Sequence, residues 1–385
     1  MSNHYEDNAT GEIVFWILML IVILASTASA VSVRTYTIKA SGGDYTTVQA
    51  AETAHNQALT TNDSALTFEI SGAWTGNDYE GAITIAGWTM DTTRNLIVIA
   101  IGDSKATHIW DVDRWACSTG AVTSITVSED FVIIDGIQVW QNHSGASYIY
   151  GINGDGGKRM TVQNSYFRSD QRAVNSCAIR QYNTGSGWTR VLNCIITEWP
   201  NAVIAYANAV IPGIHVYNCT VYDCAQTAFW SNSGRMTVKN TIAMSVGNFL
   251  GATPQNFWDT SDFNYTSDAS ITYTSCTPCG ANDLYSQADP HTDTVNGDFS
   301  LKTGSDAAEV GVDLTGRYSM LTVDINGTDR DANWDIGAHE LAAAGGDPDP
   351  VPNRRRQQLR ILGYIFDSDK YVAVQSAKRT LWLTS

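Results

Sequence analysis

Five segments of the chain repeat one pattern: FVIIDGIQVWQ (131–141), MTVQNSYFRSD (160–170), TRVLNCIITEW (189–199), IHVYNCTVYDC (214–224) and MTVKNTIAMSV (236–246). Each has a β-rich run, then Asn or Asp, then a second short apolar run. The pivot residues are Asp135, Asn164, Asn193, Asn218 and Asn240, with spacings of 29, 29, 25 and 22 residues. A pattern that returns at such a period indicates a solenoid, and its β-branched content favours one coil of a parallel β-helix per repeat.

Residues 160–167 show how one coil is built. Met160 and Val162 are expected to point inward, followed by Tyr166 or Phe167, because side chains alternate between the faces of a strand. Asn tolerates the left-handed backbone of a sharp bend, and stacked Asn side chains can hydrogen-bond from coil to coil. Asp135 fits the pivot less well than Asn. The alternative is a set of Asn-containing hairpins in a β-sandwich, which requires five aligned pivots by chance.

These coils resemble right-handed parallel β-helix proteins of the pectate-lyase-like superfamily. The segment VDINGTDRDANWDIGAHE (323–340) resembles the Asp-Ile-Gly-Ala-x-Glu motif that closes many secreted bacterial and phage-associated β-helix proteins, and YTIKASGGDYTTVQAAETA (36–54) resembles their opening. The resemblance covers about residues 36–341. It implies an all-β fold, a single right-handed parallel β-helix with an N-terminal cap helix and a short C-terminal appendage. It specifies activity weakly, because the superfamily contains lyases, hydrolases, phage spikes and proteins without known chemistry.

The closing motif is interpreted as structural. Its positions are occupied by Asp324, Gly327, Arg330, Asp335, Ile336, Gly337, Ala338 and Glu340, with His339 where an aromatic residue is commoner. Arg330, Asp335 and Glu340 are expected to satisfy the open end of the coil by salt bridges and backbone hydrogen bonds, which an uncapped sheet edge requires.

Composition limits the partners. The 385 residues are 43% hydrophobic and 16% charged, with a formal net charge of −16 and a pI near 4.7. The hydrophobic content is enough for a large core. An acidic surface repels nucleic acid, so no nucleic-acid partner is expected, and a strongly anionic substrate would need a local basic groove.

The N-terminal residues 1–30 are predicted to be a signal peptide or a membrane anchor. The apolar run Ile13–Leu24 is too short to span a bilayer comfortably, and Ala28-Ser29-Ala30 has the form of a cleavage site, which favours a signal peptide. Residues 1–12 lack the Lys or Arg that a signal peptide normally has, so an uncleaved anchor stays open. The expected location is extracellular, at the cell surface or on a virion.

Three further regions follow. Residues 31–344 are predicted to form the β-helix, with a cap helix from Thr47 to Leu59, and residues 345–352 a linker rich in Pro and Gly. Residues 353–385 form a basic tail with seven Lys or Arg against two Asp, a net charge of +5 (7 − 2). The tail is interpreted either as a docking element for a virion, a cell surface or the acidic body of the protein itself, or as a small β-hairpin on the end of the coil.

The seven cysteines do not form a disulfide framework, because their number is odd and their spacing irregular. Cys194 and Cys219 each follow a pivot Asn, so they are expected to stack as small buried residues. Cys276 and Cys279 form a CxxC pair without the partners of a zinc or thioredoxin site, which favours a loop disulfide or two inert thiols.

The sequence contains candidates for two kinds of catalytic site. A lyase needs a cation for the uronate carboxylate and a Lys or Arg base, for which Arg168, Arg172 and Arg180 are the candidates. A hydrolase needs two carboxylates, for which Asp155, Asp170, Glu198 and Asp223 are the candidates. The last three follow their pivots by 6, 5 and 5 residues and could line up on one face. Neither the R-x-P-x-x-R signature of pectate lyases nor a trio of Ca²⁺-binding Asp residues is present. No cofactor is therefore predicted, although Ca²⁺ stays open.

Aromatic residues give a third set. The candidates for stacking on sugar rings are Trp140, Trp188, Trp199, Trp230, His215 and Tyr217. His215 and Tyr217 are expected to face solvent, and Trp140 and Trp199 to project near the same edge. The sequence favours a surface protein that recognises a polysaccharide or cell-surface glycan without a clear catalytic signature. The alternatives are a lyase or hydrolase with a diverged site and a structural phage or adhesin-like component. The oligomeric state stays open, a homotrimer included.

Overall fold

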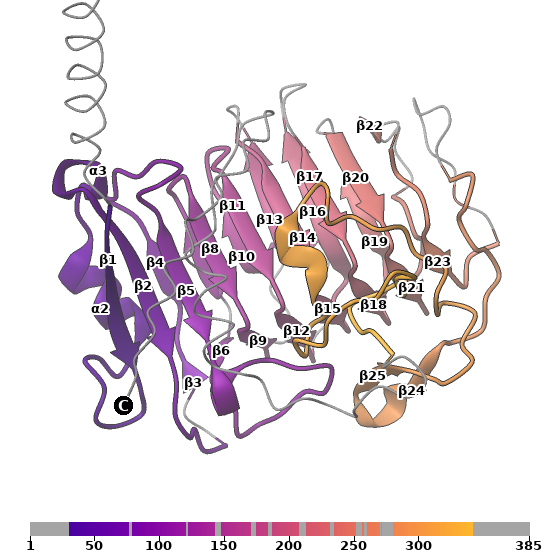
Figure 1. Ribbon diagram of the computed structural model, residues 1–385, viewed down its shortest axis with the longest axis horizontal. Helices are drawn as coiled ribbons and strands as arrows, with labels where there is room; N and C mark the ends of the chain where they lie inside the picture. Colours follow the sequence, from indigo (N-terminus) through magenta and orange to yellow (C-terminus); the bar gives the residue numbers. More distant parts are fainter. Residues whose placement is uncertain are drawn as a thin grey trace, which may run out of the picture.

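The computed structural model describes residues 31–76, 79–120, 122–142, 148–170, 175–183, 187–207, 213–231, 235–251, 256–257, 260–269, 271 and 280–341. Within these residues the chain forms a right-handed parallel β-helix with three parallel sheets of nine, eight and six strands (Figure 1). The expected all-β solenoid is confirmed.

The strands are short, as expected for coils that turn after every few residues. The nine-stranded sheet contains β1 (Ser32–Ile38), β2 (Ser64–Ile70), β5 (Leu96–Ala100), β8 (Val132–Asp135), β11 (Met160–Gln163), β14 (Thr189–Leu192), β17 (Ile214–Tyr217), β20 (Arg235–Lys239) and β22 (Asn256–Phe257). The eight-stranded sheet contains β3 (Tyr79–Glu80), β6 (Ala116–Thr119), β9 (Gln138–Gln141), β12 (Tyr166–Ser169), β15 (Ile195–Thr197), β18 (Thr220–Tyr222), β21 (Ile242–Met244) and β23 (Tyr265–Thr266). The six-stranded sheet contains β4 (Ile83–Ile85), β7 (Ile125–Val127), β10 (Tyr150–Gly154), β13 (Cys177–Asn183), β16 (Asn201–Ala207) and β19 (Thr227–Ser231).

One coil visits the three sheets in a fixed order. The chain passes from β11 in the nine-stranded sheet to β12 in the eight-stranded sheet and to β13 in the six-stranded sheet before β14 begins the next coil. The inward residues of all three sheets form one continuous core, to which β11 contributes Met160 and Val162 and β12 contributes Phe167. Tyr166 lies on the outer face instead, so Phe167 is the inward residue of the pair.

The bend between the first two sheets is made by a residue in the left-handed conformation. Asn164, Asn193, Asn218 and Asn240 have φ angles of 49°, 50°, 52° and 49°. In the coil before them this position belongs to Gly136, with φ 71°, because Asp135 pairs with Gln163, one residue before the bend. The assignment of Asp135 as a pivot is therefore wrong by one residue. Glycine adopts positive φ without steric cost, which explains why no Asn is needed there.

The Asn side chains form part of a ladder. Asn193 Nδ2 donates to Asn164 Oδ1 at 3.2 Å, and Asn164 Nδ2 donates to Asp135 Oδ1 at 2.8 Å. Asn218 differs, because both atoms of its amide are buried without a hydrogen-bond partner among the described residues. The side-chain ladder therefore joins the coils that contain Asp135, Asn164 and Asn193. At Asn218 the coil is joined to its neighbour by backbone hydrogen bonds.

A helix closes the N-terminal end of the core (Figure 1). Helix α2 (Val48–His55) begins at the N-cap Thr47, whose hydroxyl accepts from the Ala50 N–H at 3.1 Å, and α3 (Leu59–Asn62) follows it. The predicted cap helix is thus confirmed, with a break before Leu59. Both oxygens of Glu80 accept backbone N–H groups of the first turn, from Val48 at 2.8 Å and Gln49 at 2.7 Å.

The C-terminal segment returns along the outside of the coil. It contains the antiparallel pair β24 (His291–Asp293) and β25 (Asp298–Leu301) and the 3₁₀ helices η2 (Thr294–Asn296) and η3 (Ser319–Thr322), whereas η1 (Gly102–Ser104) lies earlier in the chain. Leu314, Leu321 and Trp334 of this segment pack against Leu192 and Tyr217 on the outer face of the nine-stranded sheet. Residues 312–341, here called the C-terminal strap, therefore bury a sheet face that the sequence pattern placed in solvent.

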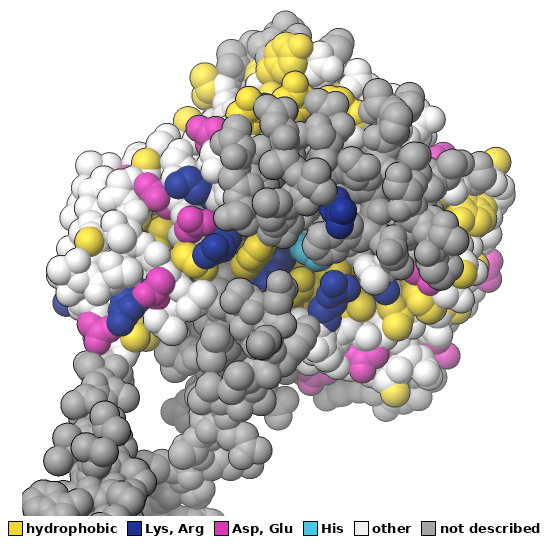
Figure 2. Space-filling view, turned by 90° about the horizontal axis from the view of Figure 1, so that it is seen from above, with side chains coloured by type: hydrophobic (Ala, Val, Ile, Leu, Met, Phe, Trp, Pro, Cys, Tyr) yellow, Lys and Arg dark blue, Asp and Glu magenta, His cyan; other side chains and the backbone are white. Residues whose placement is uncertain are grey.

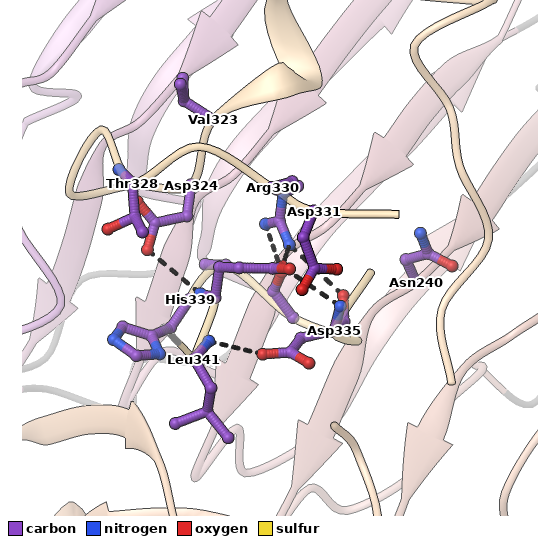
Figure 3. Close-up of polar contacts among 12 residues, drawn as sticks. Asn240, Val323, Asp324, Thr328, Arg330, Asp331, Asp335, His339 and Leu341 are labelled. Carbon is purple, nitrogen blue, oxygen red and sulfur yellow. Dashed lines mark hydrogen bonds and ion pairs between the residues drawn. The ribbon is translucent and has the colours of Figure 1, made fainter. Parts of the chain in front are cut away.

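The closing motif lies within this strap and not at the open end of the coil, so its predicted location is wrong. Figure 3 shows its polar contacts: Arg330 Nη1 donates to Glu340 Oε2 at 2.5 Å, and the Leu341 N–H donates to Asp335 Oδ2 at 2.6 Å. Asp324 accepts the Glu340 N–H at 3.1 Å. These groups are buried, and the ion pair with Glu340 compensates the charge of Arg330 inside the protein. Burial raises the pKa of Glu340 to about 7, against the lowering effect of Arg330.

The strap binds the coil through the Asn bends. Asn193 Nδ2 donates to the Val323 carbonyl at 2.7 Å and its Oδ1 accepts from Arg330 Nη2 at 3.3 Å. Asn240 Nδ2 donates to the Val312 carbonyl at 2.7 Å and Asn240 Oδ1 accepts the Val312 N–H at 3.0 Å. Asn at the bend thus supplies both the backbone conformation and the docking contacts.

None of the helices in the described residues is long and apolar enough to cross a membrane. The predicted N-terminal segment 1–30, the linker 345–352 and the tail 353–385 lie outside the described residues.

We predict that Asn193→Ala lowers the free energy of unfolding by about 2–3 kcal/mol, since it removes three side-chain hydrogen bonds and places Ala at positive φ. Asn193→Gly loses the same bonds without the backbone cost and should lose about 1 kcal/mol less. Thermal unfolding of both variants measures the difference, and equal losses would contradict the backbone argument.

Gly337 gives a second prediction. Its φ is +108°, and a Cβ there would lie 2.6 Å from Ile242 Cδ1 and 3.1 Å from Thr220 Oγ1. Gly337→Ala should therefore destabilise the protein by about 2 kcal/mol or more. The matched control is Gly316→Ala, where a Cβ meets no atom within 4 Å and no change is expected. Calorimetry of the two variants tests this, and equal melting temperatures would contradict close packing of the strap.

Glu80 gives a prediction of pH dependence. Burial raises the pKa of Glu80 from 4.5 to about 7. Between these values the folded protein holds a proton that the unfolded chain has released, so stability falls as pH rises through this window, by roughly 3 kcal/mol. Glu340 titrates in the same window, so Glu80→Gln should reduce the fall in urea midpoint between pH 4.5 and pH 7 without abolishing it. An unchanged slope in the variant would show that Glu80 is not the titrating group.

Candidate functional site

The structure distributes the predicted site residues over several places and does not bring them together in one site. Trp199 is buried in the core, His215 is 8% exposed and Tyr217 is fully buried beneath the C-terminal strap. The expected exposure of these three residues is therefore wrong. The periodicity placed His215 and Tyr217 correctly on the outer face, but it carried no information about the strap that covers that face.

The carboxylate candidates lie at the turns that follow the eight-stranded sheet. Glu198 and Asp223 have φ angles of 64° and 53°, and each donates its N–H to the last strand residue of the next coil, at 3.1 Å to Tyr222 O and 3.0 Å to Met244 O. They occupy equivalent positions in neighbouring coils, as expected. Asp170 lies one residue later, because the pairing of Arg168 with Thr197 gives Ser169 the position equivalent to Glu198.

Arg168 is bound to these carboxylates. Its Nε lies 3.3 Å from both Asp170 Oδ1 and Glu198 Oε2, with all three side chains between 35% and 40% exposed. Ion pairs at such exposure contribute little to stability. Arg168, a cation that a lyase would need, is paired with Asp170 and Glu198, two carboxylates that a hydrolase would need. The pairing therefore supports neither catalytic set.

Arg180 lies elsewhere, on the outer face of the six-stranded sheet. The register places it in line with Asn153 on β10, Ile204 on β16 and Trp230 on β19. Its guanidinium carbon lies 4.6 Å from the Tyr150 ring centroid and 4.5 Å from that of Tyr182. Within the described part of the chain Arg180 forms no ion pair. It is held by aromatic faces and keeps its polar edge for other contacts.

Aromatic rings continue along this face. The rings of Tyr182 and Tyr206 stack at a centroid distance of 5.5 Å and an interplanar angle of 15°, and Trp230 lies 6.1 Å beyond Tyr206. Arg180 is also 5.5 Å from the Tyr206 centroid. The aromatic face is defined here as Tyr150, Arg180, Tyr182, Tyr206 and Trp230. It crosses four consecutive strands and therefore runs along the axis of the coil.

Sequence reasoning found Arg180 and Trp230 but missed the three tyrosines. Tyr182 and Tyr206 are partners in the register of β13 and β16, and both lie on the outer side because Ile179 and Val203 fill the core. A signal was present, since each tyrosine follows an inward Ile or Val by three residues. It was missed because the repeat pattern covers only the first two sheets of each coil.

The two remaining tryptophans are partly buried. Trp140 on β9 pairs with Arg168 on β12. Trp188 lies before β14, where the Arg190 guanidinium carbon is 3.7 Å from its ring centroid and 4.6 Å from that of Tyr318. Figure 2 shows Lys and Arg side chains beside apolar ones and a His on the upper side of the molecule. Neither tryptophan belongs to the aromatic face.

The aromatic face contains no carboxylate, the group of which a hydrolase needs two. None of the strands β4, β7, β10, β13, β16 and β19 contains Asp or Glu. Burial raises the pKa of Tyr150, which keeps its phenol neutral. The described residues contain no group of three or more His, Cys, Asp or Glu that could hold a metal ion. The face can therefore stack and donate hydrogen bonds, but it offers no pair of carboxylates for hydrolysis.

Several predicted residues fall elsewhere. Cys117, Cys177, Cys194, Cys219 and Cys224 are buried free thiols, and the Cys194 N–H donates to Cys219 Sγ at 3.5 Å, so the expected stacking of these two is confirmed. Arg172, Cys276 and Cys279 lie outside the described residues.

No protein-family model matches the chain, and no curated protein matches it. Among solved structures the chain is similar to the pectin methylesterase of Aspergillus niger, with 14% sequence identity and a TM-score of 0.40, over 75% of this chain and 94% of that one. Both measures are low, so this similarity does not assign a function to the chain.

Proposed function

We propose that this protein binds a polysaccharide or cell-surface glycan on the aromatic face of the six-stranded sheet and does so without cleaving it. The observation that carries the proposal is the row of rings at 5.5 and 6.1 Å spacing with Arg180 held against them. Aromatic rings stack on the apolar C–H patches of sugars, and a guanidinium fixes hydroxyl or carboxylate oxygens by directed hydrogen bonds.

The rigidity of the face supports binding. The strands that carry Tyr150 and Arg180 pair with neighbours on both sides, and the strand that carries Trp230 pairs with β16. Beneath the rings, Tyr150 and Ile204 belong to a buried cluster. A preformed surface loses little side-chain freedom on binding, which favours affinity.

The absence of carboxylates on these strands favours binding over hydrolysis. The carboxylate candidates Asp170 and Glu198 are ion-paired with Arg168 at the turns after the eight-stranded sheet. The proposal places the protein where glycans are present: in the extracellular medium, at a cell surface or on a virion.

The test is a panel of uronate and neutral polysaccharides measured by affinity electrophoresis and calorimetry. Trp230→Ala and Tyr206→Ala should each weaken binding by roughly ten-fold or more, because each removes one stacking surface. Reducing ends and the ultraviolet absorbance of unsaturated products are followed in the same samples, and neither should appear.

The matched control is Tyr285→Ala, a partly exposed tyrosine outside the six-stranded sheet, which should bind as the unchanged protein does. Binding that survives both substitutions on the face would refute the proposed site. Turnover of any polysaccharide would refute the non-catalytic assignment. If Arg168→Gln then abolished this turnover, catalysis would be assigned to the turns after the eight-stranded sheet.

A further inference from the structure

Tyr148 is an aromatic residue with an unfavourable backbone angle. It lies just before β10, its φ angle is +64°, and its side chain is 64% exposed. A bulky residue at positive φ is an outlier, because its Cβ comes too close to the following carbonyl oxygen. Such outliers persist only where the surrounding structure imposes them, and they cluster at ligand-binding sites.

The other aromatic residues at positive φ are packed against the protein. Phe131 is 6% exposed and Phe263 is half-buried, so the apolar area that each removes from water offsets the backbone cost. Tyr148 lacks this compensation because most of its side chain is in solvent. In the described part of the chain, the other exposed non-glycine residues at positive φ are all polar, namely Asn175, Ser245, Ser286 and Glu309.

The side chain of Tyr148 makes no hydrogen bond and no ring contact with the residues that the structure describes. A buried phenol normally finds a hydrogen-bond partner, and an aromatic ring that supports a fold normally packs against other side chains. Neither applies to Tyr148. Contacts within the described protein therefore do not explain why an aromatic ring occupies this position.

Tyr148 adjoins the aromatic face. The next residue, Ile149, is buried and is anchored to the following coil, because its N–H donates to Ser176 Oγ at 3.0 Å. Tyr150 then begins β10, and its ring centroid lies 4.6 Å from the guanidinium carbon of Arg180. Burial raises the pKa of Tyr150, and Tyr148 is among the neighbouring groups that raise it further. The phenol of Tyr148 thus lies close to the part of the face formed by Tyr150 and Arg180.

A bound sugar would give the exposed ring a role. Aromatic rings stack on the apolar C–H patch of a pyranose, which removes apolar area of both from water. Since Ile149 is anchored, the ring of Tyr148 is presented at the edge of the face before a ligand arrives, and less freedom is lost on binding. Contact with a ligand therefore accounts for an exposed ring at a costly backbone angle.

We infer that Tyr148 is a further ligand-contacting residue of the glycan site, where it stacks on the sugar held at Arg180 from the side on which the strands begin. The inference rests on the proposed function, because it assigns Tyr148 to the same site. It requires Tyr148 to favour binding while it costs folding stability, a combination that a structural role would not produce.

The test compares two variants of the full chain, Tyr148→Asn and Tyr148→Phe, with the same polysaccharide panel as the probe, polygalacturonate and xylan included. Asn tolerates positive φ but has no ring. Tyr148→Asn should therefore bind roughly ten-fold or more weakly, and it should melt at the same temperature as the unchanged protein or up to about 4 °C higher. Tyr148→Phe keeps the ring and should bind within about three-fold of the unchanged protein.

The matched control is Val295→Asn, which removes an apolar side chain that is 94% exposed and lies outside the six-stranded sheet. It should change neither binding nor the melting temperature.

The outcomes separate the inference from the proposed function. Unchanged binding by Tyr148→Asn, with weakened binding by Trp230→Ala, would overturn the inference and leave the proposed function in place. If neither substitution weakened binding, or if the unchanged protein bound no polysaccharide, both would fall. A melting temperature of Tyr148→Asn below that of the unchanged protein would show that the ring supports the fold, and this would overturn the inference whatever the binding.

Discussion

The structure depends on a left-handed bend that recurs once per coil. At Asn164, Asn193, Asn218 and Asn240 the backbone takes φ near 50°, which turns the chain from one sheet to the next within two residues. Asn pays a lower steric penalty for this conformation than most residues, and its amide can also bond along the axis. Since the bend fixes where each strand begins, it also sets the register that stacks equivalent side chains on neighbouring coils.

That register has different consequences on the three sheets. The C-terminal strap covers the outer face at β14 and β17 of the nine-stranded sheet and part of the eight-stranded sheet, and Asn193 and Asn240 serve as its hydrogen-bond partners. On the six-stranded sheet the same stacking aligns Tyr182 with Tyr206 and brings Trp230 beside them. One repeat therefore generates a face that the strap covers and a face lined by aromatic rings, and the difference lies in which side chains occupy the outward positions and which segment packs over them.

The charged side chains also differ between the turns and the six-stranded sheet. Charged groups at the turns, such as Arg168 with Asp170 and Glu198, neutralise one another within a coil or between neighbouring coils. Arg180 is instead placed among tyrosine rings on strands without carboxylates. A cation held by aromatic faces keeps its hydrogen-bonding edge, whereas a cation between two carboxylates does not. This contrast separates the glycan-binding proposal from the catalytic alternatives.

The period and the residue types of the repeat predict the coil, its core and its cap. The repeated alternation predicted the inward Met160 and Val162, the Asn bends, the stacked Cys194 and Cys219 and the helix after Thr47, because each depends on local conformation and period. Gly136 replaced Asp135 at the first bend, since either residue type suits a turn and only strand pairing decides between them.

Tertiary structure alone decided which outer faces are covered. His215, Tyr217 and Trp199 are buried, and Arg330 meets Asn193 across 137 positions of sequence. Tyr182 joins Tyr206 and Trp230 only through the pairing of separate strands. Periodicity reports the face on which a side chain lies, but exposure depends on what packs over that face, and such contacts between distant segments leave no local pattern in the sequence.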